Sequence, residues 1–110
     1  MTALDLASEL QSIPKMVIPS PLAGFEMVRG YGVPSLPFDT GNILALRVFP
    51  QNDFAPYITI WHRTPEGEWS IHVDGPRLDT ACPRYFGAGA KLCTFAKIQL
   101  QWLDPMSLSI

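Results

Sequence analysis

The sequence predicts a single, mainly β domain over residues 1–110. We expect an antiparallel bent sheet or small β-barrel of about five to seven strands with one short N-terminal helix. Three observations favour this class. Short runs of β-branched and aromatic residues recur from residue 43 onward. The 11 Pro and 8 Gly residues mostly fall between such runs, where turns are expected. An apolar stripe of helical spacing near the N-terminus predicts one short helix.

The composition is that of a globular chain with little charge. Apolar residues make up 47% of the chain and charged residues 16%, which excludes a disordered tail. A small domain keeps much of its surface in water, so this low charge predicts that a partner covers part of it, and we expect a homodimer. The net charge of -2 and the scattered cations do not provide the basic patch of a nucleic-acid-binding protein.

Localisation is predicted from the absence of targeting patterns. No stretch reaches the roughly 20 apolar residues needed to cross a bilayer, so no membrane contact is expected. The N-terminus lacks the basic and apolar regions of a signal peptide, which predicts a cytoplasmic protein. In that compartment Cys82 and Cys93 are expected to be free thiols. Without a CxxC motif they make a poor zinc site, and no cofactor is predicted.

Residues 2–13 are predicted to form the helix. Thr2 can cap it, and Asp5 places a carboxylate near its positive end. One apolar stripe contains Leu6, Leu10 and Ile13. A helix this short is marginal by itself, so we expect it to pack across the sheet, with recognition of a partner as the alternative.

Residues 14–42 are rich in Pro and Gly, and a central strand does not hold this many prolines. We therefore predict a long ordered loop with one short strand near Phe25–Arg29. Its large apolar side chains are Phe25, Met27, Tyr31, Leu36 and Phe38. The loop is expected to lie on apolar surface, either as a flap over a cavity or as a plug at one end of a barrel.

Residues 43–110 are predicted to form the antiparallel sheet. The expected strands are Ile43–Phe49, Tyr57–Arg63, Glu68–Asp74, Thr94–Trp102 and Met106–Ile110. The first is an almost wholly apolar run, which is typical of a central strand. Residues 75–93 are expected to be irregular. The last strand ends within a β pattern, so we expect its edge to pair within its own sheet or with a second copy of the chain.

The hairpin at Tyr57–Asp74 is the most informative part of the sequence. Residues 64–67 read Thr-Pro-Glu-Gly, which fits a type I turn with a glycine bulge. Pairing of Thr64 with Glu68 then brings both histidines to one side of the ribbon. The residues of this histidine face are Ile58, Ile60, His62, Ser70, His72 and Asp74. The opposite face places Trp61 and Trp69 near diagonal contact, and it is predicted to be core.

Three interpretations of the histidine face remain open. It can be the solvent side of a half-buried sheet. It can line a cavity, where a histidine beside a carboxylate acts as a general acid or base. It can also supply metal ligands, although the spacing is not diagnostic and no metal site is assigned. The catalytic candidates are His62, His72 and Asp74, and the candidates for ligand contact on this face are Ile58, Ile60 and Ser70.

Three residues elsewhere are further candidates for ligand contact. Arg47 interrupts an apolar strand, so it either points outward or pairs with a carboxylate such as Glu26 or Asp74. Inside a cavity, Arg47 would anchor an anionic head group. Arg84 and Tyr85 lie in the segment predicted to be irregular, and Arg84 can bind a carboxylate or phosphate in a bidentate manner.

These patterns leave three functions open. The first is binding of a small apolar or amphipathic molecule between the sheet and the 14–42 loop. The second is a small enzyme of the cyclase, isomerase or lyase type, in which His62 or His72 transfers a proton and Asp74 orients it. The third is a homo-oligomeric interaction protein without a ligand. The first two require a pocket and differ in whether the histidines point into it.

Overall fold

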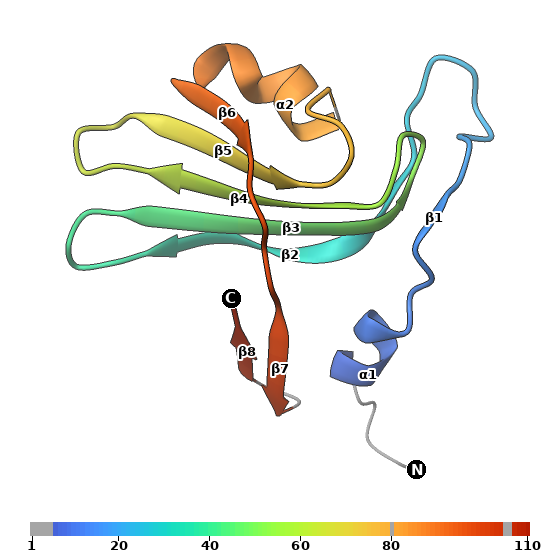
Figure 1. The fold of residues 1–110 in the computed structure, drawn as a ribbon, viewed down its shortest axis with the longest axis horizontal. Coiled ribbons are helices and arrows are strands. Elements are labelled where there is room, and N and C mark those ends of the chain that lie inside the picture. The colour runs from blue at the N-terminus through green and yellow to red at the C-terminus, as the bar shows by residue number, and fades with distance from the viewer. Residues whose placement is uncertain (1–5, 80, 105–106) are drawn as a thin grey trace.

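An open β-sheet forms the centre of the computed structural model, which describes residues 6–79, 81–104 and 107–110 (Figure 1). Its elements are α1 (Leu6–Gln11), β1 (Met16–Val17), β2 (Val28–Pro37), β3 (Ile43–Asn52), β4 (Tyr57–Arg63), β5 (Trp69–Asp74), α2 (Ala81–Phe86), the 3-10 turn η1 (Gly87–Gly89), β6 (Leu92–Phe95), β7 (Gln101–Asp104) and β8 (Ser107–Ser109). Thr2, Asp5 and Met106, which belong to predicted elements, lie outside the described residues.

The main sheet has six strands in the order β1-β3-β4-β5-β6, with β2 also paired to β3. The β1–β3 and β5–β6 pairs are parallel, and the other pairs are antiparallel. β7 and β8 form a separate antiparallel hairpin. The predicted mainly β class is confirmed. Of the two predicted architectures, the described strands form the sheet and do not close into a barrel.

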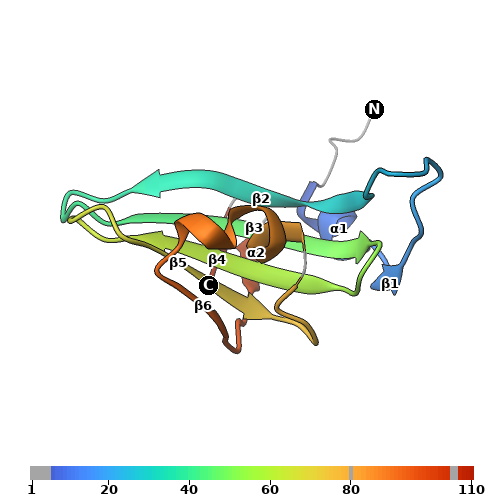
Figure 2. The same cartoon turned by 90° about the horizontal axis from the view of Figure 1, so that it is seen from above.

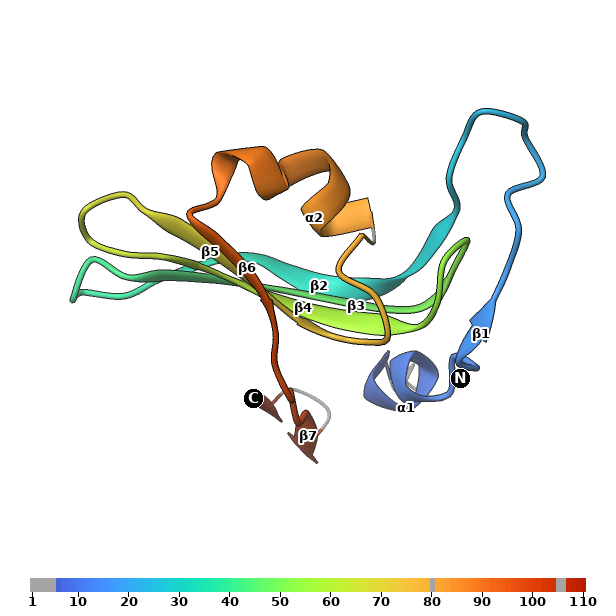
Figure 3. The same ribbon diagram turned by 45° about the horizontal axis from the view of Figure 1, so that its top comes forward.

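The sheet separates two layers. Helix α2 covers one face, and Figure 2 looks down on it above the middle strands. Helix α1 and the β7–β8 hairpin lie on the other side (Figure 3). We call these sides the α2 face and the α1 face. The radius of gyration is 15.0 Å, compared with about 13 Å expected for a compact domain of about 100 residues, so the layers are open.

Strand β2 corrects the prediction that residues 14–42 are mostly loop. Two prolines, Pro34 and Pro37, lie within it. They are tolerated because β2 pairs only with β3 among the described strands, and because its register shifts between Val33 and Leu36. Upstream, a Cβ at Gly30 would collide with the backbone carbonyl of Val48, so glycine permits the close approach of β2 to β3.

The β4–β5 hairpin has the predicted register. Gly67 has a φ of 91°, and its N–H donates to Thr64 O at 2.9 Å, as the turn with a glycine bulge requires. Ile58 pairs with Asp74, Ile60 with His72, and His62 with Ser70. The centroids of the Trp61 and Trp69 rings lie 6.3 Å apart at 83° on the opposite face, so the predicted diagonal contact is also confirmed.

The predicted strand at Thr94–Trp102 is wrong in its middle. Strand β6 ends at Phe95 and β7 begins at Gln101, and residues 96–100 cross the sheet without a ladder (Figure 1). We call residues 96–100 the crossing segment. The alternation that suggested a strand is real, because Ile98 and Leu100 are half-buried while Lys97 and Gln99 are exposed. An extended segment has this period whether or not its backbone pairs with a neighbour.

Helix α2 corrects the prediction that residues 75–93 are irregular. Pro83 occupies the first turn of α2, where a helix needs no backbone N–H donor. The helix is stabilised by packing rather than by its own length. Cys82 is 5% exposed and joins a cluster of buried residues made of Tyr57, Ile71, Val73 and Cys82 itself.

No helix in the described part of the chain is long and apolar enough to cross a membrane.

Asn52 secures the end of β3 and is fully buried. Its Nδ2 donates to the carbonyls of Phe49 and Ala55, at 3.1 and 2.8 Å. Its Oδ1 accepts from the backbone N–H groups of Phe54 and Ala55, at 2.8 and 3.0 Å. The side chain therefore supplies hydrogen-bond partners to the backbone of the turn that leads from β3 into β4. Asn52 is also the residue of β3 that pairs with Val17 of β1.

Replacing Asn52 by Ala should destabilise the domain by about 3 kcal/mol, because four hydrogen bonds are lost and buried backbone groups remain unsatisfied. Urea unfolding followed by circular dichroism measures this change. The control is Gln99→Ala at an exposed position, expected to cost about 0.5 kcal/mol or less. Equal stability of the two variants would contradict the role given to Asn52.

Candidate functional site

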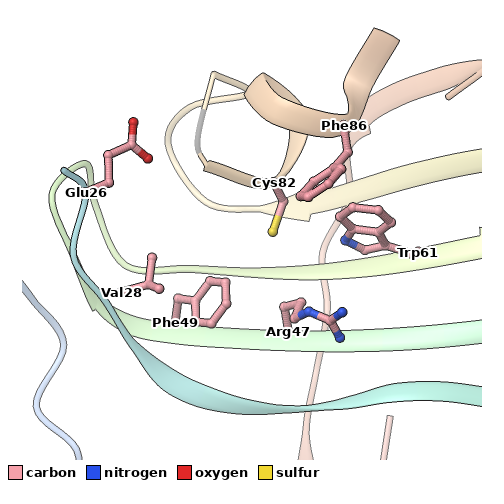
Figure 4. A pocket seen from close by; sticks show the side chains of 7 residues that line it. All are labelled: Glu26, Val28, Arg47, Phe49, Trp61, Cys82 and Phe86. Carbon is pink, nitrogen blue, oxygen red and sulfur yellow. The ribbon is translucent and has the colours of Figure 1, made fainter. Parts of the chain in front are cut away.

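A cavity of about 470 Å³ lies between the α2 face of the sheet and helix α2 (Figure 4). We call it the α2 cavity. Its apolar walls are Val28, Phe49, Trp61 and Phe86, and its polar lining residues are Glu26, Arg47 and Cys82. Cavities that hold small ligands are commonly about 300–1,000 Å³, mostly apolar, with a few polar groups. The α2 cavity has this size and this chemical character.

Strand register and helix period place these side chains together. Arg47 pairs with Thr59, and Phe49 lies two residues further along β3, so both project toward α2. Trp61 follows Thr59 by two residues on β4 and shares that face. On α2, Cys82 and Phe86 are four residues apart, so they lie on one side of the helix. The Trp61 and Phe86 rings are in edge contact, with centroids 5.2 Å apart.

Arg47 projects into the α2 cavity (Figure 4). Its Nη1 donates to the carbonyls of Val33 and Leu46, at 3.3 and 3.2 Å. Its guanidinium carbon lies 6.0 Å from the centroid of the Trp61 ring. The predicted ion pair with Glu26 or Asp74 is wrong, because Glu26 pairs with Arg84 and Asp74 is on the other face. Among the described residues Arg47 has no carboxylate partner.

Charged and aromatic contacts connect Glu26 of the cavity lining to α2 and to the loop that contains Phe54. Arg84 of α2 pairs with Glu26, and its guanidinium carbon lies 4.6 Å from the centroid of the Phe54 ring. Arg77 approaches the same ring at 5.4 Å. Arg77 also binds Asp79 through two hydrogen bonds, which lower the pKa of the Asp79 carboxyl. That pair is fully exposed, so its effect on stability is screened by solvent.

Cys82 of α2 lines the cavity, and two hydroxyl groups lie close to its sulfur. Tyr57 Oη and Thr59 Oγ1 approach its Sγ at 3.6 and 3.8 Å. Trp61 Nε1 donates to Thr59 Oγ1 at 3.2 Å, which leaves the Thr59 hydroxyl proton free to point at the sulfur. Neither Cys82 nor Cys93 forms a disulfide. The two cysteines are free thiols, as the sequence predicts.

The histidine face is the α1 face, and each of its polar side chains has a hydrogen-bond partner in the described structure. His62 Nε2 donates to Asn42 Oδ1 at 2.8 Å. His72 Nε2 lies 3.1 Å from Ser70 Oγ. Asp74 Oδ2 accepts from the backbone N–H of Ile98 at 2.8 Å. In the described structure neither histidine lines one of the five main cavities.

The predicted site residues are therefore divided between the two faces. Arg47 lines the α2 cavity, and Arg84 pairs with Glu26, which also lines it. Ile58 and Asp74 line a cavity on the α1 face, and Ile60 lines a third one of about 180 Å³. The side chain of Tyr85 lies outside the described part of the structure. Within the described residues, no group of three or more His, Cys, Asp or Glu side chains is arranged to hold a metal ion.

Sequence reasoning missed most residues of the α2 cavity. Trp61 is predicted to be core, Phe49 is placed only in a central strand, and Phe86 lies in a segment predicted to be irregular. Their common signal was weak but present: Arg47, Phe49 and Trp61 alternate onto one face once the strands are aligned. The sequence could not indicate that a short helix would stand off this face and leave a cavity rather than fill it.

Comparisons with known proteins add no functional information. No protein-family model, no curated protein sequence and no solved structure matches this chain. A functional proposal therefore rests on the geometry of the residues in this structure.

The carboxylate of Asp74 holds the crossing segment against the sheet by accepting a hydrogen bond from the Ile98 N–H. Asp74→Ala should destabilise the domain by about 2 kcal/mol, because the Ile98 N–H loses a charged acceptor. Asp74→Asn keeps an acceptor oxygen and should retain most of the stability. Limited proteolysis should cleave residues 96–100 faster in the Ala variant than in the Asn variant. Identical stability and cleavage of the Ala variant and the native chain would contradict this role.

Proposed function

We propose that this domain binds a small amphipathic carboxylic acid with a flat apolar body in the α2 cavity. The observation that carries the proposal is Arg47, a guanidinium in a largely apolar cavity with no carboxylate partner among the described residues. A charge removed from water is stabilised by an opposite charge with good hydrogen-bond geometry. The carboxylate of a ligand meets this requirement.

The donors of Arg47 support a carboxylate in particular. Both of its hydrogen bonds to the described residues start from Nη1, so Nη2 and Nε keep donors for a further acceptor. A guanidinium presents donors in a planar fork that matches two carboxylate oxygens. Glu26, the carboxylate in the same cavity, pairs with Arg84. Because Glu26 is paired in this way, the guanidinium of Arg47 can pair with the carboxylate of a ligand from solution.

The walls support a flat apolar body. Phe49, Trp61 and Phe86 present aromatic surface to the same space, and such surface prefers stacked or edge contacts with a planar ligand. Arg47 lies over the edge of this surface, within 6.0 Å of the Trp61 ring centroid. A ligand with an aromatic ring and a carboxylate can therefore contact both chemical types at once.

The acid–base hypothesis for His62, His72 and Asp74 stays a prediction. Neither imidazole lines any of the five main cavities of the described structure, and Asp74 already accepts a backbone hydrogen bond. General acid–base catalysis needs a substrate proton within hydrogen-bond reach of the base. The observations favour ligand binding on the α2 face over proton transfer on the α1 face.

Naphthoate should bind the native domain, and Arg47→Gln should weaken binding by about tenfold, because the variant loses a charged hydrogen-bond pair. Isothermal titration calorimetry measures the dissociation constants. The neutral amide of the same acid should bind the native domain and the Arg47→Gln variant equally well.

The matched control is Arg63→Gln, since Arg63 lies on the same face of β4 but outside the cavity lining. It should leave naphthoate affinity unchanged. An absence of naphthoate binding, or an equal loss in both arginine variants, would refute a carboxylate site at Arg47.

We also propose that the domain forms a homodimer through the edge of β6. Large apolar side chains are exposed in the described chain, including Leu92 at 50% and Phe95 at 54% on β6. Burial of these two side chains against a partner would remove apolar surface from water. Among the described strands β6 pairs only with β5, so its outer edge is available for pairing. The prolines of β2 disfavour pairing at the opposite edge.

Size-exclusion chromatography with light scattering over about a hundredfold range of concentration should show a monomer–dimer equilibrium. Phe95→Glu should shift it toward monomer, because a carboxylate would be buried at the edge. Phe25→Glu, at a position that is 68% exposed in a loop, is the control and should leave the equilibrium unchanged. A native chain that elutes as a monomer at every concentration would contradict the dimer.

A further inference from the structure

A second hollow region lies on the α1 face, away from the α2 cavity. Two cavities of about 240 and 320 Å³ adjoin there, because both are lined by Lys15, Val48, Pro50, Ile58 and Ile98. The sheet forms one wall. The other walls are formed by the crossing segment, by α1 and by the residues that follow α1. We call this two-lobed space the α1 groove. Figure 3 shows α1 and β7 on this side of the sheet and α2 on the other.

The walls of the α1 groove are mainly aliphatic. Leu10 and Ile13 come from α1 and the residues after it, and Ile98 and Leu100 come from the crossing segment. Together with Val48 and Ile58 of the sheet, they offer saturated surface. Tyr31 and Trp102 also line the larger lobe and Tyr57 the smaller one, but aliphatic side chains line both. In the α2 cavity three aromatic rings face one space, and Val28 is the one aliphatic side chain among its described lining residues. The two spaces therefore suit apolar groups of different shape, a flexible chain here and a flat ring there.

Trp102 is the first polar feature of the groove. Its Nε1 is buried and has no hydrogen-bond acceptor among the described residues. An indole nitrogen can only donate, and leaving such a donor unpaired costs about 1–3 kcal/mol. The Trp102 ring packs beside the Tyr31 ring, with centroids 6.1 Å apart. Trp102 lines the larger lobe, so a turn of its ring toward the lobe would bring the covered Nε1 to an acceptor there.

Lys15 is the second polar feature. It lines both lobes and forms no ion pair within the described residues. Asp74 lines only the smaller lobe, where its Oδ2 accepts from the Ile98 N–H. An anion would be repelled by Asp74 and attracted by Lys15, so its favourable position is in the larger lobe, where the Trp102 donor also lies.

We propose that the α1 groove binds a linear alkyl carboxylate. Its carboxylate accepts a hydrogen bond from Trp102 Nε1 and pairs with Lys15 in the larger lobe. Its alkyl chain lies along Val48, Ile58 and Ile98, which line both lobes. The apolar contact supplies most of the affinity, and the two donors orient the head group. This site is independent of the one proposed around Arg47.

Titration with decanoate, below the concentration at which it forms micelles, tests the proposal. In nitrogen-15 spectra of the native domain, the indole N–H resonance that is absent from Trp102→Phe should shift on addition of decanoate. Lys15→Gln and Trp102→Phe should each weaken decanoate binding by about fivefold, since each loses one polar contact with a charged group. Decanol, which lacks the charge, should bind the native domain and the Lys15→Gln variant equally.

Two controls separate this groove from the α2 cavity. Lys97→Gln removes an exposed cation of the crossing segment that lines neither lobe, and it should leave decanoate affinity unchanged. Arg47→Gln should also leave it unchanged while weakening naphthoate. The proposal is overturned if decanoate does not bind. It is equally overturned if decanoate affinity falls only in the Arg47 variant, or is the same in the native domain and in the Lys15→Gln and Trp102→Phe variants.

Discussion

The register of β3, β4 and β5 is the constraint on which the rest of the structure depends. Side chains alternate along each strand, so a shift of one residue would exchange every side chain between the two faces. The turn that ends at Gly67 fixes the β4–β5 register, and Asn52 secures the turn that joins β3 to β4. With these two turns in place, Arg47 and Trp61 face α2 while Ile58 faces α1. Both proposed sites follow from this separation.

The two layers that cover the sheet are held mainly by side-chain contacts rather than by backbone ladders. On one face, Arg84 connects α2 to Glu26 and Phe54. On the other, Asp74 holds the crossing segment through the Ile98 N–H. Layers held at a few points do not pack as densely as paired strands, and space remains beneath them. This accounts for a cavity on each side and for a radius of gyration above that of a compact domain.

The histidine face illustrates how far local pattern reaches in site prediction. The hairpin register brought its polar residues together as expected, yet His62 binds Asn42 and His72 binds Ser70. Asn42 lies in the turn between β2 and β3, and Asp74 meets a segment from beyond β6, so neither partnership can be inferred from the hairpin. Alternation predicts which side chains share a face. It does not predict which segments pack on that face. Those segments decide whether the polar groups line a cavity or form hydrogen bonds with neighbouring parts of the chain.

The sequence by itself determined the mainly β class, the central strand at Ile43–Phe49 and the turn and register of the β4–β5 hairpin, because these depend on period-two alternation and on the conformational freedom of Gly67. Only the tertiary structure decided that prolines would sit in edge strand β2, that residues 96–100 would be extended without pairing, and that α2 would form. Each of these depends on distant neighbours: an unpaired edge, a carboxylate on β5, and a buried cluster around Cys82. The location of the cavities belongs to the same category, since a cavity is the space that distant segments leave between them.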